Sequence, residues 1–255
     1  MISWLTMSNK LLSVKNLEKY FHDKTSETKA LDNITFDLYE QEFISIVGPS
    51  GCGKSTILSI LSYLEDPSNG EFKYSKDITI GYMLQDDSLF EWRTILDNCL
   101  IGLEINNKLN KESEAYVINL LKTYGLGDFI NKYPSNLSGG MRQRVALIRT
   151  LAINPDILLL DEPMSKLDYQ SRLAISDDIY KIIKKEGKTA IMVTHDISEA
   201  ISMSDRVIVI SKRPGKIKNI YNINLSDKST PINNRKSKDF NKYFDMIWGD
   251  LDVHL

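Results

Sequence analysis

The sequence has little cysteine, no long apolar run and no excess of basic residues, and each absence narrows the class of protein. Two cysteines in 255 residues, Cys52 and Cys99, cannot build a disulfide framework and are typical of a reducing compartment. No apolar stretch reaches the roughly 18 residues that a membrane-spanning helix needs. The 32 basic and 34 acidic side chains give a net charge of −2, which disfavours a general nucleic-acid binder.

The start of the chain gives no sign of export. Its first residues, MISWLTMSNK, lack a cationic segment followed by a long apolar core, so they do not resemble a secretory signal. Met1 and Met7 are both possible first residues. We therefore expect a cytoplasmic protein whose contact with a membrane comes through a partner.

Five short apolar runs predict buried strands, because near-continuous apolar sequence suits parallel strands covered on both faces. These runs cover residues 43–47, 78–83, 156–160, 189–194 and 206–210. Helical patterns lie between them, at residues 53–63, 111–124, 138–153, 169–186 and 196–203. Strands that alternate with helices in this way predict an α/β fold.

The chain departs from this alternation in three places. The first 40 residues alternate polar and apolar side chains, which predicts an antiparallel β subdomain. Residues 86–136 lack a strand signal and predict a helical subdomain. The tail, 212–255, begins as a hairpin, continues through a polar linker at 226–238 and ends in an amphipathic helix. We expect a single domain over residues 1–255, with a catalytic α/β core formed by 11–85 and 137–211.

The segment GPSGCGKST lies between an apolar run and a helical pattern, which is the context of a phosphate-binding loop. Its glycines let the backbone curl so that N–H groups face an anion, and the helix N-terminus adds partial positive charge. Lys54 can reach terminal phosphates, and Ser55 can ligate Mg²⁺. An ordinary glycine turn is the alternative. The predicted nucleotide-binding residues of this segment are Gly48, Pro49, Ser50, Gly51, Cys52, Gly53, Lys54, Ser55 and Thr56.

A pair of carboxylates, Asp161 and Glu162, ends the apolar run ILLL. Two buried carboxylates are costly without a cation nearby, and Mg²⁺ would supply that charge. Phosphate-loop ATPases hold the Mg²⁺ shell with an Asp in this position. We therefore predict that Asp161 binds the metal and that Glu162 orients or deprotonates an attacking water. A solvated acidic turn is the alternative.

Three further assignments stay open when only the residues are considered. His195 and Gln85 each follow a predicted strand, at the sheet edge where parallel folds bind ligands. His195 can contact a γ-phosphate and Gln85 can sense Mg²⁺ or water, although either could simply cap its strand. Phe21, or its neighbour Tyr20, can stack on a base or pack in the core.

The segment LSGGMRQR opens a predicted helix with two glycines, at a cost of about 1 kcal/mol each. Ser138 can cap this helix, whose first N–H groups would then face an anion. The phosphate loop, Gln85, LSGGM, LLLDEP, SKLD and His195 follow one another in the order of the ATP-binding cassette family, which the chain resembles. The resemblance covers residues 11–211 and depends most on LSGGM, the signature of that family.

This resemblance implies an ATPase with a P-loop NTPase sheet core, an N-terminal antiparallel β subdomain and a helical subdomain. It implies ATP and Mg²⁺ as ligands and a dimer of two copies as the working unit. Ser138, Gly139 and Gly140 would then close on the γ-phosphate held by the other copy, and Asp168 would lie in the loop that crosses to it.

The resemblance also implies a role for each of the three residues whose assignment the sequence alone leaves open. Phe21 becomes the adenine stack and Gln85 the lever between the nucleotide and a partner, as well as a third metal-binding residue beside Ser55 and Asp161. His195 becomes the γ-phosphate switch. The expected catalytic residues are Lys54, Gln85, Glu162 and His195.

Three less specific strings, LFEWRTILDNCLIGLEI, GGMRQRVALIRTLA and SDRVIVISKRPGKI, resemble the nitrate, sulfonate and taurine branch, which also includes importers of thiamine-precursor pyrimidines. A single cassette without a spanning segment is typical of the separate ATPase subunit of a bacterial importer. The implied partners are a permease in the membrane and, indirectly, a substrate-binding protein, with no nucleic acid. The implied location is peripheral, on the cytoplasmic face of the membrane. A cassette protein acting on DNA or ribosomes is the alternative, although such proteins usually carry coiled-coil insertions, two cassettes or basic patches.

Two residues depart from the pattern of this branch. Glu91 stands where the branch often has proline, next to the segment DDSLFEW that would border the permease groove. Lys166 replaces the usual small residue of the crossing loop. The apolar side chains Leu89, Phe90 and Trp92 are expected either to line the groove or to belong to the core.

Overall fold

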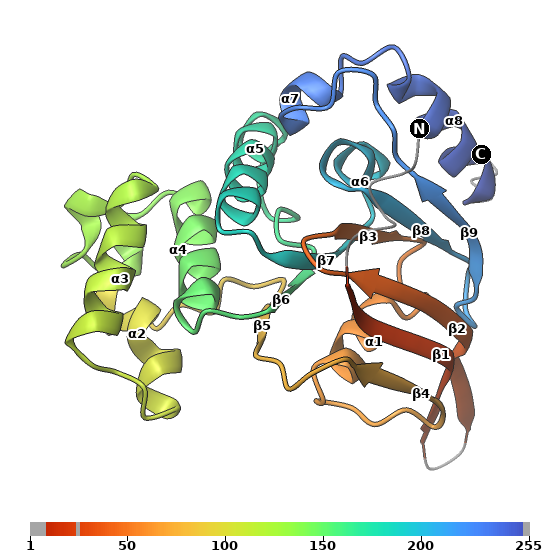
Figure 1. Ribbon diagram of the computed structural model, residues 1–255, viewed down its shortest axis with the longest axis horizontal. Coiled ribbons are helices and arrows are strands. Elements are labelled where there is room, and N and C mark those ends of the chain that lie inside the picture. The colour runs from red at the N-terminus through yellow and green to blue at the C-terminus, as the bar shows by residue number, and fades with distance from the viewer. Residues whose placement is uncertain (1–8, 24–25, 252–255) are drawn as a thin grey trace.

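Two β-sheets and the helices around them form the fold in the computed structural model, which describes residues 9–23 and 26–251 (Figure 1). The two candidate first residues, Met1 and Met7, lie outside these ranges. One sheet has six strands and the other has three. The predicted combination of an α/β core with an antiparallel β sheet and a helical region is confirmed.

The apolar runs form the six-stranded sheet, as predicted. Its strands are, in spatial order, β5 (Ile80–Met83), β6 (Ile157–Asp161), β7 (Thr189–Thr194), β3 (Phe43–Val47), β8 (Arg206–Ile210) and β9 (Ile217–Asn222). The first five strands pair in parallel, and β9 pairs antiparallel with β8. The carboxyl ends of β3, β6 and β7 therefore meet at one edge of the sheet.

In the described part of the chain, six helices form around this sheet, five where the helical patterns predict them and one, over residues 95–105, within the predicted helical subdomain. They are α1 (Lys54–Leu61), α2 (Ile95–Ile105), α3 (Lys111–Thr123), α4 (Gly139–Ala152), α5 (Tyr169–Lys185) and α6 (Ile197–Met203). Polar side chains begin five of them, because the caps accept hydrogen bonds from backbone N–H groups of the first turn; the caps are Thr94, Asn110, Ser138, Asp168 and Asp196.

Alternate residues of β6 belong to different halves of the core, which explains its uninterrupted apolar sequence. Leu158 and Leu160 pack in the cluster formed with α2, α3, α4 and α5. Ile157 and Leu159 pack in the cluster on the other face, which includes α1 and the antiparallel sheet. All four side chains are fully buried. Burial on both faces is what a parallel strand requires.

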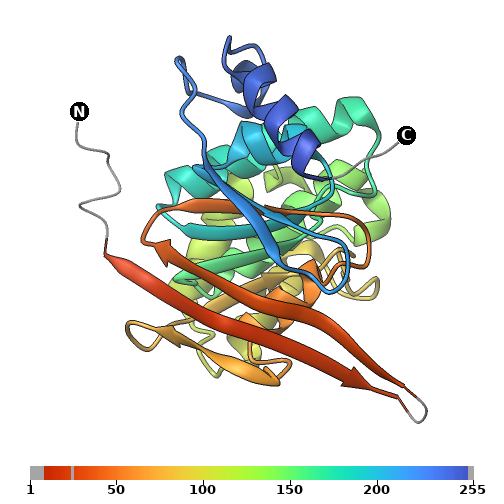
Figure 2. The same cartoon turned by 90° about the vertical axis from the view of Figure 1, so that its right-hand side faces the viewer.

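The three-stranded sheet lies beside the first and runs along one side of the molecule (Figure 2). Its strands are β2 (Glu27–Tyr39), β1 (Lys10–His22) and β4 (Asn69–Tyr74), all antiparallel. The first two strands agree with the prediction. Sequence reasoning missed β4, because its residues NGEFKY are mostly exposed and show little apolar alternation.

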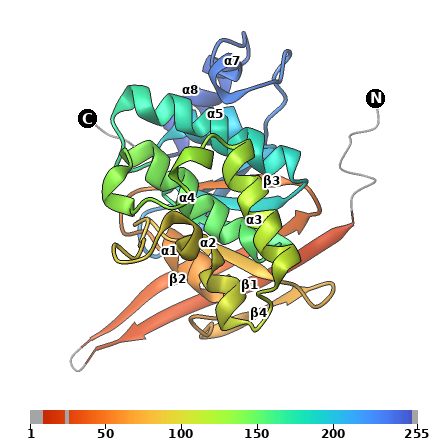
Figure 3. The same ribbon diagram turned by 90° about the vertical axis from the view of Figure 1, so that its left-hand side faces the viewer.

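The segment after Gln85 is helical, and α2 and α3 lie against α4 at one end of the molecule (Figure 3). Two short 3-10 turns, η2 (Gly127–Phe129) and η3 (Pro134–Asn136), lead back to α4. Within the described ranges, no helix is both long and apolar enough to cross a membrane.

The tail forms the predicted hairpin, β8 with β9, and ends in α8 (Phe240–Asp250). The prediction of a polar linker at 226–238 is wrong, because the segment contains α7 (Pro231–Asn234) and is anchored. Asn234 is fully buried, and its Nδ2 donates to the Ser202 carbonyl at 2.7 Å. The polar sequence does not predict this burial, because the buried polar groups are paired by hydrogen bonds with residues far away in the chain.

Candidate active site

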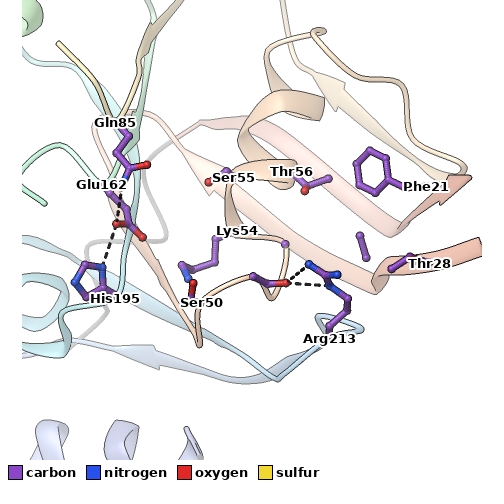
Figure 4. A pocket seen from close by; sticks show the side chains of 13 residues that line it. Phe21, Thr28, Ser50, Lys54, Ser55, Thr56, Gln85, Glu162, His195 and Arg213 are labelled. Atoms are coloured by element: carbon purple, nitrogen blue, oxygen red, sulfur yellow. Dashed lines mark hydrogen bonds and ion pairs between the residues drawn. The ribbon is translucent and has the colours of Figure 1, made fainter. Parts of the chain in front are cut away.

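A cavity of about 720 Å³ lies at the edge of the six-stranded sheet where β3, β6 and β7 end (Figure 4). Three side chains that were not predicted, Thr28, Ala30 and Arg213, line it. Most of the predicted site residues also line it: Phe21, Ser50, Gly51, Gly53, Lys54, Ser55, Thr56, Gln85, Glu162 and His195. Segments far apart in the sequence therefore contribute to one site.

The loop between β3 and α1 has the backbone of an anion-binding curl. Gly51 and Gly53 adopt φ values of +71° and +105°, which side chains disfavour. Gly51 occupies the third position of a turn in which the Cys52 N–H donates to the Pro49 carbonyl at 3.4 Å. Gly53 precedes α1 and offers no side-chain cap, so the first N–H groups of that helix remain available to an anion.

Lys54 is buried beneath this loop. Its Nζ donates to the carbonyls of Gly48 and Pro49, at 2.9 and 3.0 Å. These bonds hold the ammonium at the loop, where it can exchange carbonyl partners for phosphate oxygens. Cys52 is also buried, 4.0 Å from Nζ, and burial raises the pKa of its thiol. Its position in the core fits a packing role.

Ser55 and Asp161 meet at the end of β6. Ser55 Oγ donates to Asp161 Oδ1 at 2.9 Å, and the Tyr82 hydroxyl donates to Oδ2 at 3.3 Å. Burial raises the pKa of Asp161, against the opposing hydrogen bonds of Ser55 and Tyr82, and the charge of Glu162 adds to the rise. A cation here would relieve the cost of this buried carboxylate.

The donor set fits Mg²⁺ that is shared with a nucleotide. Among the described residues, no group of three or more His, Cys, Asp or Glu side chains could hold a metal by itself. Mg²⁺ usually takes one or two carboxylates and completes its shell with water and phosphate oxygens. A hydroxyl and a carboxylate 2.9 Å apart beside the phosphate loop match that requirement.

Glu162 lies at the centre of a second polar group. Its Oε2 accepts from Gln85 Nε2 at 3.3 Å and lies 3.1 Å from His195 Nδ1. Its backbone has φ +43°, a left-handed conformation that is rare outside glycine and common at functional sites. A carboxylate held between an amide and an imidazole can accept a proton from a water molecule in the cavity.

Phe21 lies at the other end of the cavity, on β1, in the view of Figure 4. Its ring is 42% exposed, and Lys19 Nζ lies 5.1 Å from the ring centroid. Tyr20 does not line the cavity; Lys29 Nζ lies 5.0 Å from its ring instead. Of the two candidates, Phe21 lines the cavity and Tyr20 does not, and stacking on a base stays a prediction for Phe21.

The signature residues and Asp168 lie outside this cavity. Ser138 caps α4 by accepting from the Met141 N–H at 3.4 Å, and Asp168 caps α5 by accepting from Gln170 and Ser171. A Cβ at Gly139 would lie 3.2 Å from Leu167, and one at Gly140 would lie 3.0 Å from Ile175. Close packing against Leu167 and Ile175 is therefore one reason for glycine at these two positions. Contact with a second copy stays a prediction for all four residues.

The segment after Gln85 is fixed to α4 by charge. Arg142 pairs with Asp87 at 2.7 Å and with Glu91 at 2.8 Å, so Glu91 has a partner on the signature helix. Lys166 pairs with Asp86. Leu89 is buried in the core, whereas Trp92 is 74% exposed and packs against Phe90 with ring centroids 5.0 Å apart. The apolar side chains of DDSLFEW therefore divide between core and surface.

Arg213 is the side chain at the cavity that sequence reasoning missed most clearly. It lies in the turn between β8 and β9. The sequence KRPG predicts this turn, because proline and glycine favour turns, and it places a cationic side chain there. The sequence alone does not show that this turn lies against the phosphate loop, 162 positions earlier in the chain. Thr28 and Ala30, on β2, escaped notice for the same reason.

Known proteins were compared with this chain. The model of the ABC transporter family matches residues 31–165. An uncharacterized ABC transporter ATP-binding protein, YtlC of Bacillus subtilis, is 46% identical over 91% of this chain and 92% of its own length. The chain belongs to the ABC transporter family. It is an ATP-binding cassette ATPase.

Other relatives of this ABC ATPase carry more specific names. The taurine import ATP-binding protein TauB of Ruegeria pomeroyi is 36% identical over 96% of both chains. The aliphatic sulfonates import ATP-binding protein SsuB of Bacillus thuringiensis is 37% identical over 84% of this chain and 87% of its own. A solved dimeric structure of the cassette MJ0796, bound to ADP and Pi after hydrolysis, has a TM-score of 0.71 at 32% identity, with 84% of this chain and 99% of that chain covered.

Proposed function

We propose that this ABC ATPase is the ATP-hydrolysing subunit of a bacterial importer, in which two copies bind two Mg-ATP between them and drive a permease in the membrane. The observation that carries the proposal is the cavity at the sheet edge. Phosphate-binding, metal-binding and water-activating groups from four strand ends come together there.

The chemistry follows from the positions of the side chains. The glycine loop and Lys54 would bind the phosphates, while Ser55, Asp161 and Gln85 would hold Mg²⁺. Bound Mg²⁺ would neutralise charge on the transferred phosphoryl group. Glu162 accepts the proton of the attacking water, and His195, 3.1 Å from it, contacts the γ-phosphate. Phe21 stacks on adenine at the opposite end of the cavity.

A second copy would complete the site. Each cavity lacks the signature residues of its own chain, since Ser138, Gly139 and Gly140 do not line it. The N-terminus of α4 can supply further N–H donors only to a phosphate outside its own cavity. In a head-to-tail dimer these donors reach the γ-phosphate of the partner, and Asp168 crosses with them. The dimeric structures of the MJ0796 cassette support a working unit of two copies.

The permease would bind beside the segment 86–92. Trp92 presents an exposed aromatic ring there, packed against the half-buried Phe90, and Arg142 ties the segment to the signature helix. Movement of a permease helix at Trp92 would thereby be transmitted to Gln85 on one side and to α4 on the other. The chain would lie peripherally on the cytoplasmic face, and a substrate-binding protein would act through the permease.

The transported molecule is proposed to be a small anion or heterocycle, of the nitrate, sulfonate, taurine or thiamine-precursor type. The TauB and SsuB relatives favour a sulfonate within this group. The near-neutral charge and these relatives give no support to the alternative that the protein acts on DNA or ribosomes.

Reconstitution with a candidate permease of the sulfonate importer type tests the proposal. We expect ATP-dependent uptake of taurine or another alkanesulfonate by vesicles that contain both proteins, and no uptake with Glu162→Gln. We also expect the permease to stimulate ATP turnover. Stimulation by DNA or ribosomes, with none by any permease, would contradict the importer function while leaving the ATPase intact.

A further inference from the structure

Arg213 makes a two-pronged contact with the phosphate loop from the tail hairpin. Its Nε and Nη2 both donate to the Gly51 carbonyl, at 3.0 and 2.7 Å (Figure 4). Hydrogen bonds from an ionised donor are stronger than those between neutral groups, and the planar guanidinium fixes their direction. The contact joins residues 162 positions apart in the chain.

The carbonyl that Arg213 holds sets the curl of the loop. Gly51 has φ +71° and sits inside the turn closed by the weak Cys52 to Pro49 bond, at 3.4 Å. An exposed glycine in this conformation gains backbone freedom easily when it loses its partners. The Arg213 bonds orient the Gly51–Cys52 peptide and so oppose the reopening of the curl.

Arg213 acts from a fixed base. The Gly215 N–H donates to the Ala30 carbonyl, and the Gly215 carbonyl accepts from the Asp32 N–H, both at 2.9 Å. A Cβ at Gly215 would lie 2.3 Å from the Cys52 carbonyl oxygen, so this turn packs directly on the phosphate loop. The turn that carries Arg213 is therefore held by β2 on one side and by the loop on the other.

The guanidinium also faces the nucleotide cavity. Arginine has five N–H donors, and the two bonds to Gly51 use two of them. Arg213 lines the cavity between the phosphate loop and the base end at Phe21. Arg213 therefore holds the loop from a position at the wall of the cavity itself.

We propose that Arg213 is a positioning residue for the nucleotide: it holds the phosphate loop in its binding curl through Gly51, so nucleotide affinity depends on it while the chemical step does not. The loop binds the phosphates that ATP and ADP share, so the effect applies equally to both. The inference rests on the ATP site proposed above.

Titrations of the full chain with fluorescent ATP and ADP test this role. We expect Arg213→Ala to weaken both affinities about tenfold, equivalent to about 1.4 kcal/mol, and to leave turnover at saturating ATP within about twofold. Arg213→Lys should not restore affinity, because an ammonium on a flexible stem cannot reproduce the planar two-pronged bond. Lys212→Ala, which removes the neighbouring cation of the same turn, should bind as the wild type does.

Three results would overturn the proposal. One is wild-type affinity in Arg213→Ala. Another is full rescue by Arg213→Lys, which would indicate a simple attraction between charges. The third is a loss of affinity matched by a lower melting temperature without nucleotide, which would indicate a structural role. Wild-type binding in the same titration reports separately on the ATP site, so failure of that site and failure of the Arg213 role are distinguishable.

Discussion

At the scale of single residues, the site contains a buried carboxylate, Asp161, that costs folding stability. Asp161 ends a buried strand next to Glu162, and burial raises its pKa. A raised pKa means that the charged carboxylate is disfavoured in the folded chain relative to the unfolded one. The charge of Asp161 therefore lowers stability above the raised pKa, and this cost shrinks as the pH falls through that pKa and is gone below the unfolded value.

Asp161→Asn should separate stability from function. Without nucleotide, we expect a gain of about 1 kcal/mol, which corresponds to a melting temperature higher by about 2–4 °C. The asparagine keeps partners for Ser55 and Tyr82 but removes the charge that Mg²⁺ needs. ATP binding should therefore lose its dependence on Mg²⁺, and turnover should be abolished.

Glu162→Gln is the matched comparison for this variant. It leaves Asp161 in place, so Mg²⁺-dependent binding should persist while turnover is lost. Thermal melts and ATP titrations in Mg²⁺ and in EDTA measure both effects. A lower melting temperature for Asp161→Asn, or binding that still responds to Mg²⁺, would contradict the assigned metal role.

At the scale of elements, the sequence predicts best where one physical requirement dominates. Burial makes the five parallel strands of the six-stranded sheet visible as apolar runs, with ends within about two residues of those observed. The exposed strand β4 left no such pattern. The anchored linker around Asn234 was misread, because hydrogen bonds between distant residues stabilise it.

The site residues also divide into those that the sequence predicts and those that it does not. Phosphate-loop residues are contiguous and follow from one motif, and Asp161 and Glu162 follow from the end of one strand. Arg213 and Thr28 come from elements whose approach to the loop depends on strand order, which composition and periodicity do not reveal. The predicted roles of Gln85 and His195 needed the family resemblance, although the fold brings both to Glu162.

Asp205 joins three elements at the opposite end of β3. Its Oδ2 accepts from the Phe43 N–H at 2.9 Å and from Lys184 at 3.1 Å, and its Oδ1 accepts from Lys228 at 2.6 Å. Burial alone would raise the pKa of Asp205, but the two lysines outweigh it and hold the pKa below its ordinary value. This contact ties the start of the strand to α5 and to the tail.

Asp205→Asn should destabilise the protein by about 1–2 kcal/mol at neutral pH, a figure reduced because the side chain is about one-third exposed. A lowered pKa gives stability that is present above the unfolded value, about 3.9, and is lost as the pH falls through the folded value. The difference from wild type should therefore shrink below about pH 4.

Urea unfolding between pH 3 and pH 7 measures this difference. The exposed Asp245, changed to asparagine, is the control and should unfold as the wild type does at every pH. An Asp205→Asn defect that stays constant across the range would show that the charge pairs are not its source.

At the scale of the whole molecule, the distribution of phosphate-binding groups is the central feature. One chain holds a cavity with Lys54 and Glu162, and a separate helix N-terminus at Ser138 that does not line it. In the proposed dimer, two copies placed head to tail would bring each set to the other. ATP would then stabilise the dimer, and loss of the γ-phosphate would remove the contact and let the dimer open.

The most direct test is sedimentation of Glu162→Gln, which should bind ATP without hydrolysing it. The account predicts monomers without nucleotide and with ADP, and dimers with Mg-ATP. A monomer under all three conditions, with ATP demonstrably bound, would contradict the proposed two-copy site.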